Sequence, residues 1–264
     1  MDGLLGSAGE WLGAERIAVG TMVLLLSITG VWWAAGRYGN PGSLRLRTGN
    51  LAALGLLLLA LFLLLTCVLY EPALQRLDRE VFQAVYQSGS PALTRAFSLV
   101  CLVSGHVGSP LVALLAALGT WMRGRRGALP LFVFTLLGVM GLEILASAHM
   151  GRSRPVPGEY GYFLYSYPSG DTMLALALSV LLWVLWLPGC GNRWEALLVR
   201  VAALVWPPLV AFARLYVGEH FLTDVVAGFF LGGAWICLTG CYCCTREQDC
   251  PVASAPHPAG ALTL

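Results

Sequence analysis

The sequence predicts an all-α protein, a polytopic bundle of helices that crosses a membrane several times. Hydrophobic residues make up 58% of the 264 residues, and charged residues make up only 11%. In a soluble globular domain about a quarter of the residues are charged. A spanning helix needs about 20 mostly apolar residues, and long apolar runs recur along this chain. We therefore expect an integral membrane protein.

Each of seven apolar runs is predicted to span the membrane. These spans cover residues 17–35, 50–70, 97–122, 128–147, 171–187, 196–213 and 221–243. The first run lacks the basic start and the cleavage site of a signal peptide, so we expect an uncleaved span. Between the second and third spans, residues 71–95 alternate charged and apolar side chains at helical spacing. This pattern indicates an amphipathic helix at the membrane interface.

Polar connections divide the chain into three parts. Residues 1–49 are expected to contain an extra N-terminal span and a cytoplasmic loop. Residues 50–244 are expected to form the membrane domain. Residues 245–264 contain three prolines and are expected to be a short disordered tail.

The charged and sulfur-bearing residues argue against several partner classes. The formal net charge is +2, and all 16 basic residues are scattered arginines, so no nucleic-acid partner is expected. The cysteines near the C-terminus do not form two Cys-x-x-Cys pairs and have only His257 near them, so we expect no metal. They are Cys241, Cys243, Cys244 and Cys250. Thiols at a membrane boundary, open to acylation, are the preferred interpretation.

The placement of arginines predicts the orientation of the bundle. The loops 36–49, 123–127 and 188–195, together with the C-terminal tail, lie on one side and carry eight arginines. Because cytoplasmic loops are enriched in basic residues, this side is predicted to face the cytoplasm. The polar segments 148–170 and 213–220 then share the outer face. The arginine-only composition suggests a GC-rich genome, and we expect a bacterial inner membrane.

Cations, a histidine and carboxylates gather in two polar stretches of the chain. The first stretch contains Gly-Arg-Ser-Arg-Pro at residues 151–155 and Tyr-Pro-Ser-Gly-Asp at residues 167–171. The second stretch contains Arg214, His220 and Asp224, with the spacing Arg-x5-His-x3-Asp. Arginine side chains and the free N–H groups of a helix N-terminus both bind phosphate. Together the two stretches predict one phosphate site at the rim of a membrane bundle.

In order and spacing, these motifs resemble the three signatures of the type 2 phosphatidic acid phosphatase superfamily. That superfamily shares its helical core with the vanadium haloperoxidases. The resemblance covers roughly residues 50–240 and implies a six-span phosphatase-like core, with the span at 17–35 as an addition. It also implies hydrolysis of a lipid phosphate without a metal or another cofactor.

The resemblance assigns a role to each matching residue. It implies that His220 is the nucleophile that forms a phosphohistidine and that Asp224 orients its ring. If residues 220–224 are helical, the i,i+4 spacing places both side chains on one face. Two arginines and the start of the fifth span are implied to bind the phosphoryl oxygens. These groups are Arg154, Arg214, Ser169 and the amide of Gly170.

Two positions depart from the family signatures. Ser147 occupies the place of a lysine, and Asp171 occupies the place of a histidine that donates a proton to the leaving group. Each change removes positive charge from an anion site, and Asp171 must be protonated to act as the acid. Arg152 and His149 flank the place of the missing lysine and are candidate phosphate ligands.

Two more polar residues lie within predicted spans. For Glu143, a structural ion pair with an arginine near the site is preferred over a proton relay. For His106, a histidine bonded to a backbone carbonyl inside the bundle is preferred over a proton donor. His149 is either an exposed loop histidine or a ligand of the phosphate site.

The leading hypothesis is an integral membrane phosphatase that acts on a lipid phosphate or diphosphate at the outer face. Candidate substrates are phosphatidic acid, phosphatidylglycerol phosphate, undecaprenyl diphosphate and lipid A. The alternative is a catalytically degenerate member that binds lipid phosphate headgroups or a membrane partner without turnover. The loss of positive charge at Ser147 and Asp171 favours this alternative.

Overall fold

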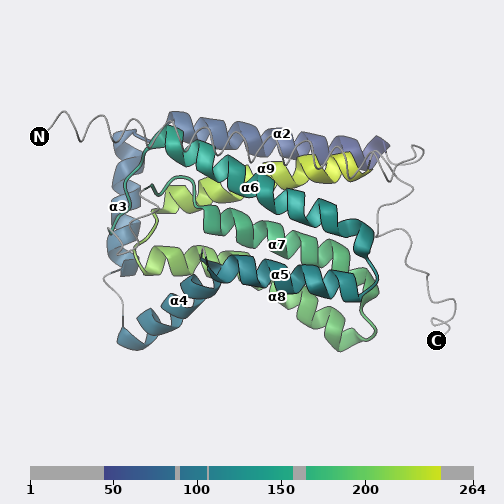
Figure 1. The fold of residues 1–264 in the computed structure, drawn as a ribbon. Coiled ribbons are helices and arrows are strands. Elements are labelled where there is room, and N and C mark those ends of the chain that lie inside the picture. Colours follow the sequence, from purple (N-terminus) through teal and green to yellow (C-terminus); the bar gives the residue numbers. More distant parts are fainter. Residues whose placement is uncertain (1–44, 87–89, 106, 157–164, 245–264) are drawn as a thin grey trace, which may run out of the picture.

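The structure is a computed structural model that describes residues 45–86, 90–105, 107–156 and 165–244 (Figure 1). All regular elements of the described residues are helices, which confirms the predicted all-α bundle. They are α2 (Arg45–Cys67), α3 (Pro72–Tyr86), α4 (Pro91–Ser104), α5 (Gly108–Met122), α6 (Leu129–Met150), α7 (Gly170–Trp186), α8 (Arg193–Tyr216) and α9 (Leu222–Cys244). Short 3-10 helices precede α6 at Arg126–Ala128 and follow α7 at Leu187–Gly189. The predicted span 17–35 and tail 245–264 lie outside the described residues.

Several helices are long and apolar enough to cross a membrane. Within the described part of the chain, four meet these criteria by themselves: Gly49–Cys67, Arg126–Met150, Arg193–Tyr216 and Leu222–Cys241. The pair α4 and α5 supplies a fifth if it counts as one broken span. The predicted fifth span corresponds to α7, which is apolar but has only 17 residues. The chain is therefore a multi-pass membrane protein.

The third predicted span, residues 97–122, is wrong as a continuous helix. Two helices replace it, and α4 and α5 are bent by 58° with respect to one another. At the break the chain turns so tightly that a Cβ at Gly108 would lie 2.3 Å from the carbonyl oxygen of Leu102. The side chain of Ser109 donates a hydrogen bond to the carbonyl oxygen of Ser104 at 2.6 Å, which satisfies one end of α4. Glycine, serine and Pro110 thus override the apolar pattern that predicted one span.

The predicted interface helix, residues 71–95, is also divided. Its first part is α3, which lies across one end of the bundle (Figure 1). Its last residues belong to α4, because Ser90 caps a new helix by accepting a hydrogen bond from the Leu93 amide at 3.3 Å. Pro91 at the first helical position fits such a new N-terminus.

α7 lies at the centre of the bundle, in contact with α6, α8 and α9 (Figure 1). The first turn of α9 lies close to the start of α7, since the Ser169 amide donates a hydrogen bond to the carbonyl oxygen of Asp224 at 2.9 Å. A Cβ at Gly228 would lie 2.7 Å from the carbonyl oxygen of Ser169, so only glycine allows this approach. The start of α7 and the start of α9, which both carry predicted site residues, are therefore held together.

Candidate active site

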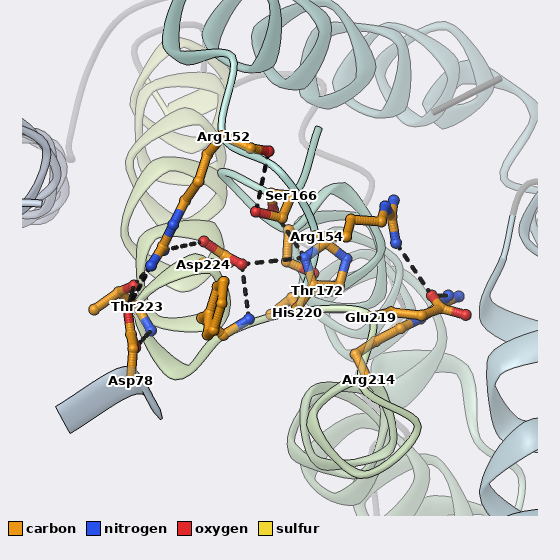
Figure 2. A network of polar contacts seen from close by, with 12 residues as sticks. Asp78, Arg152, Arg154, Ser166, Thr172, Arg214, Glu219, His220, Thr223 and Asp224 are labelled. Atoms are coloured by element: carbon orange, nitrogen blue, oxygen red, sulfur yellow. Dashed lines mark hydrogen bonds and ion pairs between the residues drawn. The ribbon is translucent and has the colours of Figure 1, made fainter. Parts of the chain in front are cut away.

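The two polar stretches meet at the end of the bundle that α3 covers (Figures 1 and 2). One stretch comprises the connection between α6 and α7, and the other comprises the end of α8 and the start of α9. The site residues that these stretches bury are Arg152, Ser166, Ser169, Asp171, Arg214, His220 and Asp224. The predicted convergence of the two stretches is thus observed in the structure.

His220 has one ring nitrogen bonded and the other free. Its Nδ1 atom lies 2.8 Å from the carbonyl oxygen of Ser166. A carbonyl oxygen can only accept, so Nδ1 carries the proton and donates it. The Nε2 atom of the neutral ring then holds its lone pair. This atom is buried and has no hydrogen-bond partner among the described residues. His220 is thus in the tautomer that leaves the Nε2 lone pair unused, which is the form that a nitrogen nucleophile requires.

Asp224 supports His220 at longer range than the helical spacing suggests. Its Oδ2 atom lies 3.7 Å from Nδ1 of His220, beyond a good hydrogen bond. The same oxygen accepts the amide of Phe221 at 2.8 Å. His220 itself precedes α9, which begins at Leu222, so the condition that residues 220–224 form a helix is not met. The carboxylate can still stabilise the positive charge that a phosphorylated ring acquires.

Arg152 holds Asp224 from the opposite side (Figure 2). Its Nη1 atom contacts Asp224 Oδ1 at 2.5 Å and the Thr223 hydroxyl at 2.6 Å, and its Nη2 contacts Asp78 Oδ2 at 2.6 Å. The guanidinium also lies 4.4 Å from the centre of the Phe221 ring. Arg152 was expected as a phosphate ligand. In the structure its two terminal nitrogens are instead engaged by carboxylates, so it positions Asp224 and ties α3 to α9.

Arg214 is anchored by contacts with α7 and α4. Its Nη2 atom contacts Asp171 Oδ2 at 3.2 Å and the carbonyl oxygen of Cys101 at 3.0 Å. Its Nη1 atom contacts Glu219. Its Nε atom is buried and has no partner among the described residues. This free N–H donor is available to a phosphoryl oxygen.

Glu219 links the two predicted phosphate arginines (Figure 2). A single oxygen, Oε2, contacts Nη1 of Arg214 and lies 3.4 Å from Nη1 of Arg154. Burial opposes ionisation of Glu219, but the charge of Arg214 and its hydrogen bond outweigh burial and lower the pKa of this carboxyl.

The start of α7 brings Ser169 and Gly170 to the site. Ser169 is the residue before the helix, and its hydroxyl lies 3.0 Å from the Thr172 hydroxyl. It is fully buried. A Cβ at Gly170 would lie 2.6 Å from the Cγ of Glu143, so the Glu143 side chain packs directly on this helix start. The start of α7 thus lies beside Glu143 and, through the Ser169 amide, beside Asp224, and helix N-termini bind anions such as phosphate.

The residues around the missing lysine are arranged less favourably for phosphate. Ser147 is buried, and its hydroxyl donates to the carbonyl oxygen of Ile144 at 3.2 Å within α6. His149 is in the last turn of α6 and is exposed. His106 lies outside the described residues. In this region, therefore, the described residues show no cation that replaces the lysine.

Three of the site residues carry atoms that also bind metals. One donor atom each from Asp171, Glu219 and His220 lies within 4.8 Å of the others. Both carboxylates, however, already contact the guanidinium of Arg214. A cation placed among them would meet this positive charge, whereas an anion would be attracted to it. The arrangement fits an oxyanion better than a metal.

Four contributors to the site were missed by sequence reasoning. They are the carbonyl of Ser166, Asp78, Thr223 and Glu219. Backbone carbonyls carry no signal in a sequence. Asp78 is only 1% exposed, but in the sequence it lies among the charged residues Arg76, Arg79 and Glu80, so no local signal distinguishes it. Glu219 could have been suspected from its place directly before the histidine.

Comparisons with known proteins agree with this geometry. The family model described as the PAP2 superfamily matches residues 143–248, which include both polar stretches from Glu143 onward. An undecaprenyl-diphosphatase of Sulfolobus acidocaldarius is 36% identical over 72 residues. That alignment covers 27% of this chain and spans only 30% of the length of the relative.

The fold is similar to a solved membrane protein. The crystal structure of a transmembrane PAP2 type phosphatidylglycerolphosphate phosphatase from Bacillus subtilis superposes with a TM-score of 0.62. The superposition covers 70% of this chain and 94% of the other chain, at 22% sequence identity. At this identity the likeness establishes the shared helical fold, and the activity of this chain has to be argued from its own residues.

Proposed function

We propose that this membrane protein, whose residues 143–248 match the PAP2 superfamily model, is a phosphatase that hydrolyses a lipid phosphate or diphosphate through a phosphohistidine at His220. The observation that carries the proposal is the buried Nε2 atom of His220, which has no hydrogen-bond partner among the described residues. The ring has a nitrogen within 4.8 Å of the carboxylates of Asp171 and Glu219, and both of these carboxylates contact Arg214. A nucleophile facing cationic groups is what transfer of a phosphoryl group requires.

In the first step, the Nε2 lone pair attacks the phosphorus atom. The nitrogen–phosphorus bond forms while the bond from phosphorus to the leaving oxygen breaks. The phosphoryl group is held by Arg154, by the free Nε–H of Arg214 and by the N-terminus of α7. The positive charge on the imidazole is stabilised by Asp224, and the Ser166 carbonyl keeps the Nδ1 proton in place.

In the second step, a water molecule attacks the phosphorus of the phosphohistidine. The nitrogen–phosphorus bond breaks, inorganic phosphate is released, and His220 returns to the neutral form with Nε2 free. The Ser166 carbonyl and Asp224 contact His220 in both steps, and Arg152 holds Asp224 in both.

The proton that the leaving oxygen takes up is proposed to come from near Asp171, at the place of the family histidine. The ion pair between Asp171 and Arg214 uses the carboxylate form, whereas donation requires the protonated form. The structure therefore supports a second role for Asp171, which is to position Arg214. The acid role remains a prediction, and the pH dependence of Asp171→Asn separates it from the positioning role.

The substrate is proposed to be a phosphorylated lipid reached from the outer face of a bacterial inner membrane. The arginines on the opposite side of the bundle support this orientation. The relatives are named for undecaprenyl diphosphate and phosphatidylglycerol phosphate, and both are candidate substrates here, together with phosphatidic acid and lipid A. The proposed catalytic domain extends over residues 50–244, with the predicted span 17–35 outside it.

Release of inorganic phosphate by the purified protein in detergent tests the proposal. We expect the wild type to release phosphate from at least one of the four lipids and His220→Ala to release none above background. His257→Ala, the same substitution in the tail outside the family match, is the matched control and should behave as the wild type. Equal rates for the wild type and His220→Ala would refute the mechanism. Lipid binding without turnover in the wild type would favour the degenerate alternative.

A further inference from the structure

Glu219 occupies the place where the proposed function puts a phosphoryl oxygen. Its Oε2 atom contacts Arg214 and lies 3.4 Å from Arg154, so one carboxylate oxygen is shared by two guanidinium groups. Arginine binds carboxylate and phosphate oxygens in the same way, through charge-assisted hydrogen bonds. A phosphoryl group that uses both arginines must therefore compete with Glu219 for the same donors.

The donors of Arg214 show where this competition takes place. Nη2 is used by Asp171 and by two groups of α4, the Cys101 carbonyl and the Ser104 hydroxyl. Nη1 is used by Glu219, and only Nε is without a partner among the described residues. An oxyanion that bonds to Nε would displace no hydrogen-bond partner among the described residues. The N–H group of Nη1 that Glu219 accepts becomes available only if the Glu219 carboxylate leaves.

Glu219 can leave without disturbing the nucleophile. The amides of Glu219 and His220 both donate to the carbonyl oxygen of Arg214, at 3.0 and 3.4 Å, so the backbone here is fixed. The Glu219 side chain is 25% exposed, whereas that of His220 is 2% exposed. A rotation of the Glu219 side chain toward solvent thus frees Nη1 while His220 stays in place.

The charges show what Glu219 does before substrate arrives. Arg154 and Arg214 face two carboxylates, those of Glu219 and Asp171. The formal charges of these four groups cancel, so the two arginines are held in position without being left uncompensated in a partly buried site. When substrate binds, its phosphoryl group replaces Glu219 as the anion between the two arginines. The affinity for phosphate is lower as a result, because the contacts of Glu219 with Arg154 and Arg214 must be broken.

From these contacts we propose that Glu219 is an internal anion that occupies the phosphate seat of the empty site, holds Arg154 and Arg214 in place, and must be displaced by the phosphoryl group of the substrate. The inference rests on the proposed function, because it takes the two arginines as phosphate ligands. It makes Glu219 a residue that sets affinity for phosphoryl groups.

Binding of inorganic phosphate, measured by isothermal titration calorimetry on the full-length protein in detergent, tests the inference. In Glu219→Gln the competing charge is removed, and we expect Kd for phosphate to fall about tenfold, the scale of one charge-assisted contact. Glu80→Gln makes the same charge change at an exposed position of α3 and should leave Kd unchanged. If Glu219→Gln does not fold, Glu219→Ala serves in its place with the same expectation.

The outcome for Arg214→Ala separates the two levels of the argument. If Arg214→Ala loses phosphate binding but Kd is unchanged or raised in the Glu219 variant, the displacement inference is overturned while the phosphate site stands. If Arg214→Ala binds phosphate as the wild type does, or if the wild type binds none, the site assignment fails and the inference fails with it.

Discussion

The Nδ1 atom of His220 donates a hydrogen bond to the backbone carbonyl of Ser166 at 2.8 Å. This contact fixes the ring so that Nε2 is the nitrogen without a hydrogen-bond partner among the described residues. The side chain expected to orient the ring, Asp224, lies farther away at 3.7 Å. The tautomer is therefore set by the main chain of the connection between α6 and α7, and the carboxylate contributes charge. This division of roles makes the effect of removing each group distinguishable.

Replacement of Asp224 by asparagine is expected to slow phosphate release without abolishing it. The Ser166 carbonyl still holds Nδ1, but the charge that stabilises the phosphorylated ring is gone. We expect kcat to fall by about 10²-fold, less than the about 10⁴-fold seen when the carboxylate bonded to a catalytic histidine is replaced. Steady-state kinetics with the best lipid substrate measure this. A loss as complete as that of His220→Ala would show that Asp224 is needed to orient the ring.

Replacement of Asp78 by alanine is expected to destabilise the fold. Asp78 is 1% exposed and pairs with Arg152, and it also accepts the amide and hydroxyl of Thr223. Removal of one partner of a buried ion pair typically costs about 3–5 kcal/mol. Chemical denaturation in detergent should show a loss of this size, with Glu80→Gln on the same helix as the control. An unfolding free energy equal to that of the wild type would mean that Asp78 does not stabilise the site.

Replacement of Asp171 by asparagine separates the two roles proposed for it. If Asp171 positions Arg214, the variant should raise KM by about tenfold and keep the shape of the pH–rate profile. If Asp171 donates the proton, the wild-type rate should fall as Asp171 ionises with rising pH, and this limb should vanish in the variant. The ion pair with Arg214 leads us to expect the first result. The pH dependence of kcat and KM for both proteins decides between them.

The ion pairs of Glu219 should stabilise the folded protein in a defined pH range. Because contact with Arg214 lowers the pKa of Glu219 below its ordinary value of 4.5, the stabilisation is present above pH 4.5. It is lost as the pH falls through the pKa of the folded state. At neutral pH we expect the wild type to exceed Glu219→Gln in unfolding free energy by on the order of 1 kcal/mol. Denaturation curves should show this difference disappearing below pH 4.5, and a difference that persists there would contradict the ion-pair account.

Much of the architecture could be predicted from the sequence because apolar runs report directly on membrane spans. The helical bundle, the approximate positions of α2, α6, α8 and α9, and the joining of the two polar stretches were all expected. The break between α4 and α5 was not expected, because the few polar, glycine and proline residues between Ser104 and Pro110 stand in a run that is otherwise mostly apolar. A composition window averages over such residues, whereas the backbone responds to each of them.

The site was less predictable than the fold, for a physical reason. Arg152 and Arg154 are only two residues apart and look equivalent as phosphate ligands in the sequence. In the structure, Arg152 is enclosed by Asp78 and Asp224, while Arg154 contacts Glu219. The carboxylates that each arginine contacts lie more than 60 positions away in the chain, and no local pattern contains that information.

The most direct test of the central claim is to trap the covalent intermediate. The purified protein would be incubated with a lipid substrate labelled with ³²P in its terminal phosphate and then quenched in alkali, in which nitrogen-linked phosphate survives. We predict label on the wild-type chain, located by peptide mapping to His220, and no label on His220→Ala. Turnover of the lipid by the wild type with no label at His220, or label that persists in His220→Ala, would contradict the account.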